Sequence, residues 1–198
     1  MNLPNKLTIA RVILVPFFMI FIILPDISPL SQLTCDLIAA VLFGIASLTD
    51  MLDGKIARKY NLITDFGKFM DPIADKLMTF GAFFMFMVSD VYAHYRFAFA
   101  FVVFVVLVRE FAVTSLRLVA QTSGGKVIAA GMSGKIKTVS QIIFILIALL
   151  EKHVFFFSDF CAHYMPLSVL ACAVMLFFTV LSGIEYFKDN LSFLDPSK

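Results

Sequence analysis

Residues 97–118 read FAFAFVVFVVLVREFAVTSLRL, and twelve apolar residues precede the first charged side chains, Arg109 and Glu110. A helix that crosses a membrane needs about 20 mostly apolar residues, so this stretch is long enough for one. The whole chain of 198 residues is 61% hydrophobic and 15% charged. Soluble domains average about 45–50% apolar and about 25% charged residues. The composition therefore excludes a water-soluble globular enzyme, and it also excludes a disordered chain.

Similar apolar runs recur along the sequence. None of them alternates with a period of two residues, so a β-barrel is not expected. We predict an all-α polytopic membrane protein with six transmembrane helices, formed by one domain that covers residues 1–198. The six runs cover residues 8–25, 33–50, 69–89, 97–118, 138–157 and 166–187.

The basic residues predict the orientation of the chain in the membrane. Loops on the cytoplasmic side carry an excess of Lys and Arg. Arg96 and Lys152 alone are assigned to the opposite set of loops, so both termini are expected in the cytoplasm. The basic residues assigned to the cytoplasmic side are Lys6, Arg11, Lys55, Arg58, Lys59, Lys68, Arg117, Lys126, Lys135, Lys137, Lys188 and Lys198.

A second stretch, residues 47–76, reads SLTDMLDGKIARKYNLITDFGKFMDPIADK and holds four carboxylates at regular spacing. Residues three and four apart share one face of a helix. The first stripe is therefore made of Asp50, Asp53, Gly54 and Ala57, with Arg58 next to it. A second stripe, at steps of four, is made of Gly67, Asp71 and Asp75. Two helices joined by a short basic loop would bring the four carboxylates together.

Such a group of Asp residues predicts a metal site. Four clustered carboxylates cannot all be ionised in a low-dielectric site without compensation, and ligand sets made only of oxygens favour Mg²⁺ or Mn²⁺. Two divalent ions would balance the four charges, and Arg58 could then hold phosphate oxygens. The alternative is that these Asp residues cap helices or pair with Lys55, Arg58 and Lys68, but eight positions at fixed spacing make this a poor explanation.

The stretch resembles the signature of the CDP-alcohol phosphatidyltransferase family, with all eight marked positions present. The resemblance implies a six-helix membrane enzyme, generally dimeric, that moves a phosphatidyl group from a CDP-linked lipid to an alcohol and releases CMP. It also implies that Asp50, Asp53 and Asp71 are metal ligands and that Asp75 is the general base, with a possible metal contact. By the same resemblance, Gly54, Ala57, Arg58 and Gly67 line the CDP site. Asn5, at the start of the first helix, is a further candidate for positioning the nucleotide.

The second half of the chain bears on the acceptor alcohol. Arg109, Arg117, Lys135 and Lys137 are all expected toward the cytoplasmic mouth, where they would suit a phosphorylated acceptor better than the cations choline or ethanolamine. For the lysines, topology and attraction to anionic lipid remain an alternative explanation. The strings REFAVTSLR and GKIKT, with LPNKLTIAR and SGIEYF, are similar to the bacterial members of the family that make phosphatidylglycerophosphate.

The expected reaction follows from this resemblance. CDP-diacylglycerol and sn-glycerol 3-phosphate would give phosphatidylglycerophosphate and CMP at the cytoplasmic face of the cell membrane, with Asp75 taking the proton of the acceptor hydroxyl. A cardiolipin synthase, or another family member with an anionic acceptor, is one alternative. A divalent-cation transporter is a more remote one, since it too could place Asp residues at membrane depth.

Overall fold

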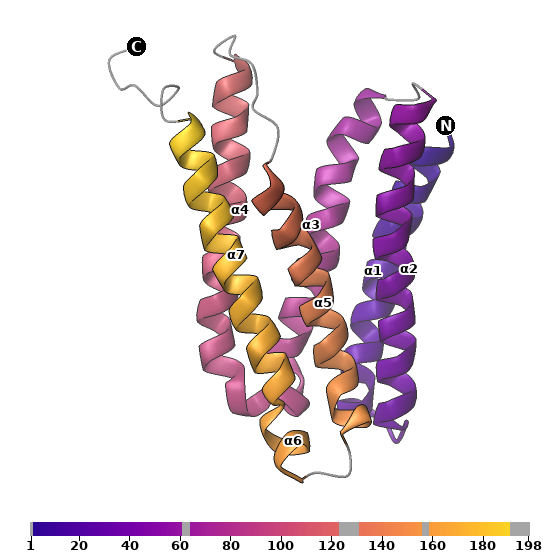
Figure 1. Ribbon diagram of the computed structural model, residues 1–198. Helices are drawn as coiled ribbons and strands as arrows, with labels where there is room; N and C mark the ends of the chain where they lie inside the picture. Colours follow the sequence, from indigo (N-terminus) through magenta and orange to yellow (C-terminus); the bar gives the residue numbers. More distant parts are fainter. Residues whose placement is uncertain (1, 61–63, 123–130, 156–158, 191–198) are drawn as a thin grey trace. The chain divides into compact units, whose positions relative to one another are not determined.

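The computed structural model describes residues 2–60, 64–122, 131–155 and 159–190, and the regular structure in these ranges is entirely helical (Figure 1). The predicted all-α class is therefore confirmed for the described residues. Two short helices, η1 (Asp90–Tyr95) and α6 (Asp159–Tyr164), accompany the long ones. The long helices are α1 (Leu3–Ile27), α2 (Gln32–Lys59), α3 (Asp65–Val88), α4 (Arg96–Thr122), α5 (Met132–Val154) and α7 (Pro166–Asn190).

The helices do not end where the apolar runs end. α2 continues past Asp50 to Lys59, since the polar residues of the Asp motif are themselves helical. α5 begins about two turns before the predicted run 138–157, because the polar segment before Thr138 joins the helix. Apolar runs mark the part of a helix that lipid can cover, and the hydrogen-bonded helix extends beyond it.

Five segments of the described residues are long and apolar enough to cross a membrane. They are Pro4–Ile27, Gln32–Ile56, Asp90–Ala120, Met132–Val154 and Pro166–Asn190. The predicted third run forms α3, but charged side chains crowd the first half of that helix, so its crossing of the membrane stays a prediction. These charged residues are Asp65, Lys68, Asp71, Asp75 and Lys76.

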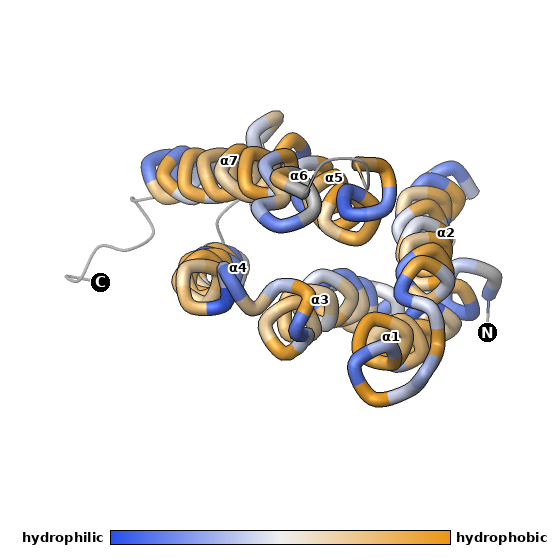
Figure 2. The backbone as a smooth tube through the Cα atoms, turned by 90° about the horizontal axis from the view of Figure 1, so that it is seen from below, coloured by the Kyte–Doolittle hydropathy of each residue, from blue (hydrophilic) through white to orange (hydrophobic). Residues whose placement is uncertain are grey.

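The helices carry apolar side chains on their outer faces, as a protein in lipid does. On α4, Phe97, Phe101 and Phe104 are 85%, 75% and 64% exposed, and Val108 and Phe111 continue the same face. Hydrophobic residues, orange in Figure 2, dominate the long helices. In water such a surface would be an aggregation hazard, whereas lipid tails cover it without cost. The structure thus supports a membrane protein.

The chain divides into two compact units. The first contains Met1–Arg96 and Ile145–Met165, and the second contains Phe97–Phe144 and Pro166–Lys198. The division falls within α5, whose first half belongs to the second unit and whose second half belongs to the first.

In the first unit, α1 packs against both α2 and α3. The rings of Phe18 and Phe43 lie 5.4 Å apart between α1 and α2. Gly81 lets α3 approach α1 closely, because a Cβ atom at this position would lie 3.1 Å from the sulfur of Met19 and 3.2 Å from Val15. The start of α1, the end of α2 and the start of α3 lie at the same end of this unit (Figure 1). The packing therefore brings the two halves of the Asp motif to one end.

A second polar cluster lies near the start of α2. Asp36 is buried and accepts two hydrogen bonds from Gln32 at 3.0 and 3.1 Å. His153 of α5 lies 2.7 Å from the same carboxylate. The Tyr92 hydroxyl donates to the carbonyl oxygen of Ala148 at 2.9 Å, so η1 is also tied to the second half of α5. These bonds fasten the last turns of α5 to the first unit.

In the second unit, apolar contacts join α4 to α7 and to the first half of α5. Val113 and Leu116 of α4 form a buried cluster with Tyr186, against which Phe187 packs. The rings of Phe99 and Phe144 lie 5.6 Å apart. The Arg117 guanidinium lies 5.9 Å from the centre of the Tyr186 ring, within the range of a cation–π contact.

Candidate active site

Arg11 of α1 joins the two carboxylates in the first half of the Asp motif. Its side chain is completely buried, and its two terminal nitrogens donate to Asp50 Oδ1 and Asp53 Oδ2, each at 2.5 Å. The Asp53 side chain is only 5% exposed, while that of Asp50 is 38% exposed. A buried charge is stable only when it is paired, so the guanidinium and the two carboxylates hold one another in place.

Further hydrogen bonds join α1 to the start of α3. Thr8, one turn before Arg11, donates its hydroxyl to Asp71 Oδ1 at 2.8 Å. Thr64 donates to Asn5 Oδ1 at 3.0 Å, and the same Thr64 oxygen accepts from the backbone N–H of Gly67 at 3.1 Å, which caps α3. Asn5, Thr8 and Arg11, spaced by three residues, thus form one polar face of α1 that points at both halves of the motif.

Gly67 lies where a larger residue would collide with this network. A Cβ atom at position 67 would lie 3.2 Å from Asn5 Oδ1 and 3.3 Å from Thr64 Oγ1, closer than most Cβ contacts. It would also lie 3.8 Å from Asp71 Oδ2. The glycine thus allows the start of α3 to lie close to Asn5, and the assignment of Gly67 to the CDP site stays a prediction.

Three of the four Asp carboxylates are close enough to repel one another. Asp71 acts electrostatically on Asp50 and on Asp53, and Asp50 acts on Asp53. Asp75 lies one turn beyond Asp71 on α3 and is half-buried. In the described parts of the chain, no three His, Cys, Asp or Glu side chains converge tightly enough to hold a metal ion. The shared metal site of Asp50, Asp53, Asp71 and Asp75 therefore stays a prediction. Arg11 donates a hydrogen bond to one carboxylate oxygen of Asp50 and to one of Asp53.

The remaining CDP-site candidates lie on the last turns of α2. Gly54 follows Asp53 and is partly buried. Ala57 and Arg58 belong to the same helix, but their side chains lie outside the described residues. The proposed grip of Arg58 on the diphosphate therefore stays a prediction.

Two of the four acceptor candidates, Arg109 and Lys137, meet at Glu110. Lys137 Nζ donates to Glu110 Oε1 at 2.5 Å, and Arg109 Nη1 donates to the same oxygen at 2.9 Å. Arg109 Nη2 also donates to Ser182 Oγ of α7 at 3.0 Å. Only 7% of the Lys137 side chain and 13% of the Arg109 side chain are exposed. Two cations share one carboxylate, so this network of the second unit keeps a formal charge of about +1.

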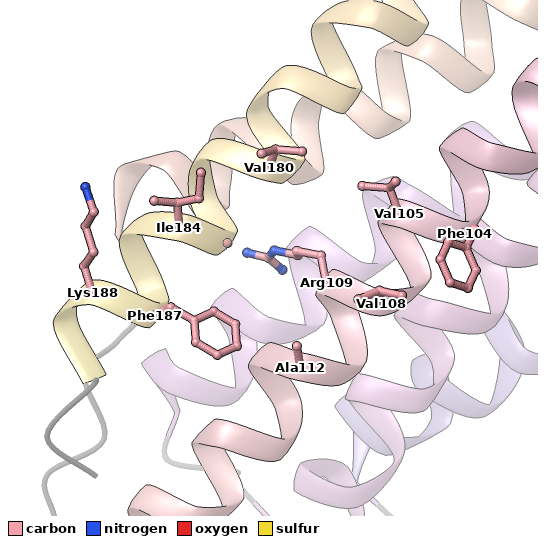
Figure 3. A pocket seen from close by; sticks show the side chains of 10 residues that line it. Phe104, Val105, Val108, Arg109, Ala112, Val180, Ile184, Phe187 and Lys188 are labelled. Atoms are coloured by element: carbon pink, nitrogen blue, oxygen red, sulfur yellow. The ribbon is translucent and has the colours of Figure 1, made fainter. Parts of the chain in front are cut away.

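Arg109 also lines an apolar groove of about 530 Å³ between α4 and α7 (Figure 3). Its guanidinium points across the groove toward α7 (Figure 3), and Lys188 is the other charged residue of the lining. The other two acceptor candidates, Arg117 and Lys135, have exposed side chains on α4 and α5. The groove lining is Phe104, Val105, Val108, Arg109, Ala112, Val180, Gly183, Ile184, Phe187 and Lys188.

In the sequence, Arg11 serves only as one of the basic residues that indicate the cytoplasmic side, and its contact with Asp50 and Asp53 is not predicted. The spacing of Asn5, Thr8 and Arg11 on one face of an apolar helix was the signal that could have revealed it. Arg109 and Glu110 are neighbours in the chain, and adjacent helical residues do not normally face each other. Their side chains are nevertheless long enough to meet beside the helix.

Comparison with known proteins identifies the family of the chain. The model of the CDP-alcohol phosphatidyltransferase family matches residues 1–182. A protein of Bacillus subtilis (strain 168), named CDP-diacylglycerol–glycerol-3-phosphate 3-phosphatidyltransferase, is 45% identical over 202 residues, which cover 99% of this chain and 98% of the relative.

Two further relatives carry the same name. The protein of Rickettsia typhi (strain ATCC VR-144 / Wilmington) is 32% identical over 94% of this chain and 96% of its own length. The protein of Haemophilus influenzae (strain ATCC 51907 / DSM 11121 / KW20 / Rd) is 38% identical over 72% of each chain. The chain belongs to the CDP-alcohol phosphatidyltransferase family.

Proposed function

We propose that this protein transfers the phosphatidyl group of CDP-diacylglycerol to sn-glycerol 3-phosphate, giving phosphatidylglycerophosphate and CMP. The observation that carries the proposal is the 45% identity, over nearly the full length of both chains, to a relative named for this reaction. The polar end of the first unit supports it, since Asp50, Asp53 and Asp71 are held there by the polar face of α1.

We infer that the Asp motif binds two Mg²⁺ or Mn²⁺ ions, because enzymes of this family generally use divalent metal ions. The donor atoms fit, since all four candidate side chains offer carboxylate oxygens, the ligands that these ions prefer. Arg11 changes the charge balance that the carboxylates alone suggest. Four carboxylates and one guanidinium give about −3, one divalent ion leaves about −1, and the second brings the site to about +1, which suits an anionic diphosphate.

Bound ions would compensate the charge of the diphosphate and of the departing CMP. In our proposal, Arg58, Gly54, Ala57 and Gly67 line the site of the CDP group, and Asn5 helps to position the nucleotide. Asp75 accepts the proton of the free primary hydroxyl of glycerol 3-phosphate. The hydroxyl oxygen forms a bond to the lipid-side phosphorus, and the bond from this phosphorus to the bridging oxygen breaks, so CMP leaves with that oxygen.

The acceptor phosphate is proposed to bind to Arg109, Arg117, Lys135 and Lys137 of the second unit. The network around Glu110 supports this, because it keeps a positive charge in a mostly buried position, where an anion is bound more strongly than in water. The exposed Arg117 and Lys135 add charge on the same two helices. A cationic acceptor such as choline would be repelled by this group.

We also propose six membrane spans, with α3 as the sixth, both termini in the cytoplasm, and a substrate site that opens to the cytoplasmic side of the cell membrane. The placement of Lys and Arg along the sequence supports this orientation. The family resemblance further suggests a homodimer. Labelling of single cysteines introduced into the loops of a cysteine-free variant, with a membrane-impermeant reagent, tests the orientation.

Purified protein incubated with CDP-diacylglycerol and a panel of acceptor alcohols tests the proposed reaction. We expect CMP release and a phosphomonoester lipid with glycerol 3-phosphate, and neither product with choline or ethanolamine. If phosphatidylglycerol serves as acceptor and glycerol 3-phosphate does not, the protein is a cardiolipin synthase. Metal uptake into vesicles without any CMP release would support a divalent-cation transporter and contradict the proposal.

A further inference from the structure

Arg11 lies in an unusual position for a cation. It belongs to a segment that can cross a membrane, its side chain is completely buried, and its two terminal nitrogens contact Asp50 and Asp53. Its third nitrogen, Nε, is buried without a hydrogen-bond partner in the described part of the chain. Burying an ionised group at such depth costs several kcal/mol unless it is paired, so membrane topology alone does not explain an arginine at this position.

The two carboxylates that Arg11 contacts are two of the four that we assign to the metal ions. The guanidinium uses Asp50 Oδ1 and Asp53 Oδ2, and a divalent ion that binds these carboxylates has to share or displace this contact. A unit charge a few ångströms from a divalent ion repels it strongly in a site of low dielectric constant. Without metal, the same guanidinium offsets part of the repulsion between Asp50 and Asp53.

We propose that Arg11 is an internal counter-cation of the metal centre: it offsets part of the negative charge of Asp50 and Asp53 when no metal is bound, and it competes with the divalent ion for the same oxygens. The inference rests on the proposed metal site of the transferase. It predicts that Arg11 stabilises the metal-free protein and weakens metal binding. The metal would therefore exchange more readily than its carboxylate ligands alone would allow.

The geometry also explains why this residue is Arg and not Lys. The fork of a guanidinium can donate to two carboxylates at once, whereas one ammonium group is a single point charge on a flexible stem. Lys at position 11 would neutralise one carboxylate well and leave the other more available to a metal ion. A graded series of substitutions at this position therefore separates charge from geometry.

The test measures Mn²⁺ binding to metal-free purified protein without substrates, by electron paramagnetic resonance of the free ion. We expect Arg11→Gln to bind Mn²⁺ at least tenfold more tightly than wild type, which corresponds to about 1.4 kcal/mol, and Arg11→Lys to lie between the two. Lys6→Gln is the matched control, because it removes an exposed charge from the same end of α1, and its affinity should stay within about twofold of wild type.

Thermal unfolding gives a second measurement. Cys35 is buried in the first unit, so a thiol-reactive dye reports when that unit opens, provided that Cys161 and Cys172 are replaced by Ser in every variant compared. Metal-free Arg11→Gln should unfold at a lower temperature than wild type, and saturating Mn²⁺ should close most of this gap. If Arg11→Gln does not fold, the Mn²⁺ affinity of Arg11→Lys still tests the inference, because this variant should also bind Mn²⁺ more tightly than wild type. Equal or weaker Mn²⁺ binding by the substituted protein would overturn the inference, because Arg11 would then support the ligands without competing with the metal.

A separate assay of wild-type protein with both substrates keeps the inference and the proposed function apart. If wild type makes the lipid product but the Arg11 series binds Mn²⁺ no more tightly, the inference alone fails. If the series behaves as expected but wild type transfers no phosphatidyl group, the proposed function fails and the inference stands.

Discussion

Substitution of Glu110 tests the network that joins α4, α5 and α7 in the second unit. Glu110→Gln removes the negative charge that Lys137 and Arg109 share, and the side chains of these two residues are 7% and 13% exposed. Removing one partner of a buried ion pair costs about 3–5 kcal/mol, because the remaining charge is left uncompensated. We expect the lower value, about 3 kcal/mol, since the amide oxygen of Gln still accepts a hydrogen bond.

For a chain of this size, about 3 kcal/mol corresponds to a fall in Tm of roughly 6–12 °C. Circular dichroism at 222 nm is a suitable probe, because the described structure is helical and the chain contains no Trp. Glu185→Gln, an exposed carboxylate on α7, is the control and should change the stability by no more than about 0.5 kcal/mol.

A double-mutant cycle with Lys137→Met distinguishes an ion pair from a general effect of the substitutions. When both partners are removed, no lysine charge is left without its carboxylate, so the double variant should be at least about 1.5 kcal/mol more stable than the sum of the single effects predicts. Additive effects, or a Glu110→Gln variant as stable as the Glu185→Gln control, would refute the reasoning.

Three further substitutions test the assigned sites. Asp75→Asn should abolish turnover while the helical signal is retained, and a near-normal rate would show that Asp75 is not the base. Arg117→Ala should chiefly raise the KM for glycerol 3-phosphate; a raised KM for the CDP-lipid instead would move this residue to the other substrate. Gly67→Ala places a Cβ atom 3.2 Å from Asn5 Oδ1 and should raise the KM for CDP-diacylglycerol about tenfold, whereas Gly44→Ala, with no atom within 4 Å, should be close to wild type. Equal effects of the two glycine substitutions would argue against a binding site beside position 67.

Hydrophobicity predicted the helices well because it reflects the solvent that each helix must meet. The run 97–118 lies within α4 and the run 166–187 within α7. The ends of the helices were less predictable, since backbone hydrogen bonding continues α2 through Asp53 to Lys59 after the apolar residues stop. The third predicted run, 69–89, corresponds to α3, but Asp71 and Asp75 make the first half of this helix polar, so α3 is not among the segments that are apolar enough to cross a membrane.

The candidate site could be predicted only in part. Sequence spacing identified Asp50, Asp53 and Asp71, whose mutual proximity the structure supports. It did not identify Arg11 as the partner of Asp50 and Asp53, because this contact joins two different helices, α1 and α2, through one long side chain. Such contacts depend on how helices far apart in sequence pack, and the pattern within one helix carries little information about them.

The most direct test of the central claim is the stoichiometry of the transfer. Purified protein is incubated with CDP-diacylglycerol, radiolabelled sn-glycerol 3-phosphate and Mg²⁺, and both CMP and label in the lipid phase are counted. The account predicts one labelled phosphomonoester lipid for each CMP, and neither product after chelation of the metal. CMP release without label in the lipid, or equal transfer in metal-free protein, would contradict it.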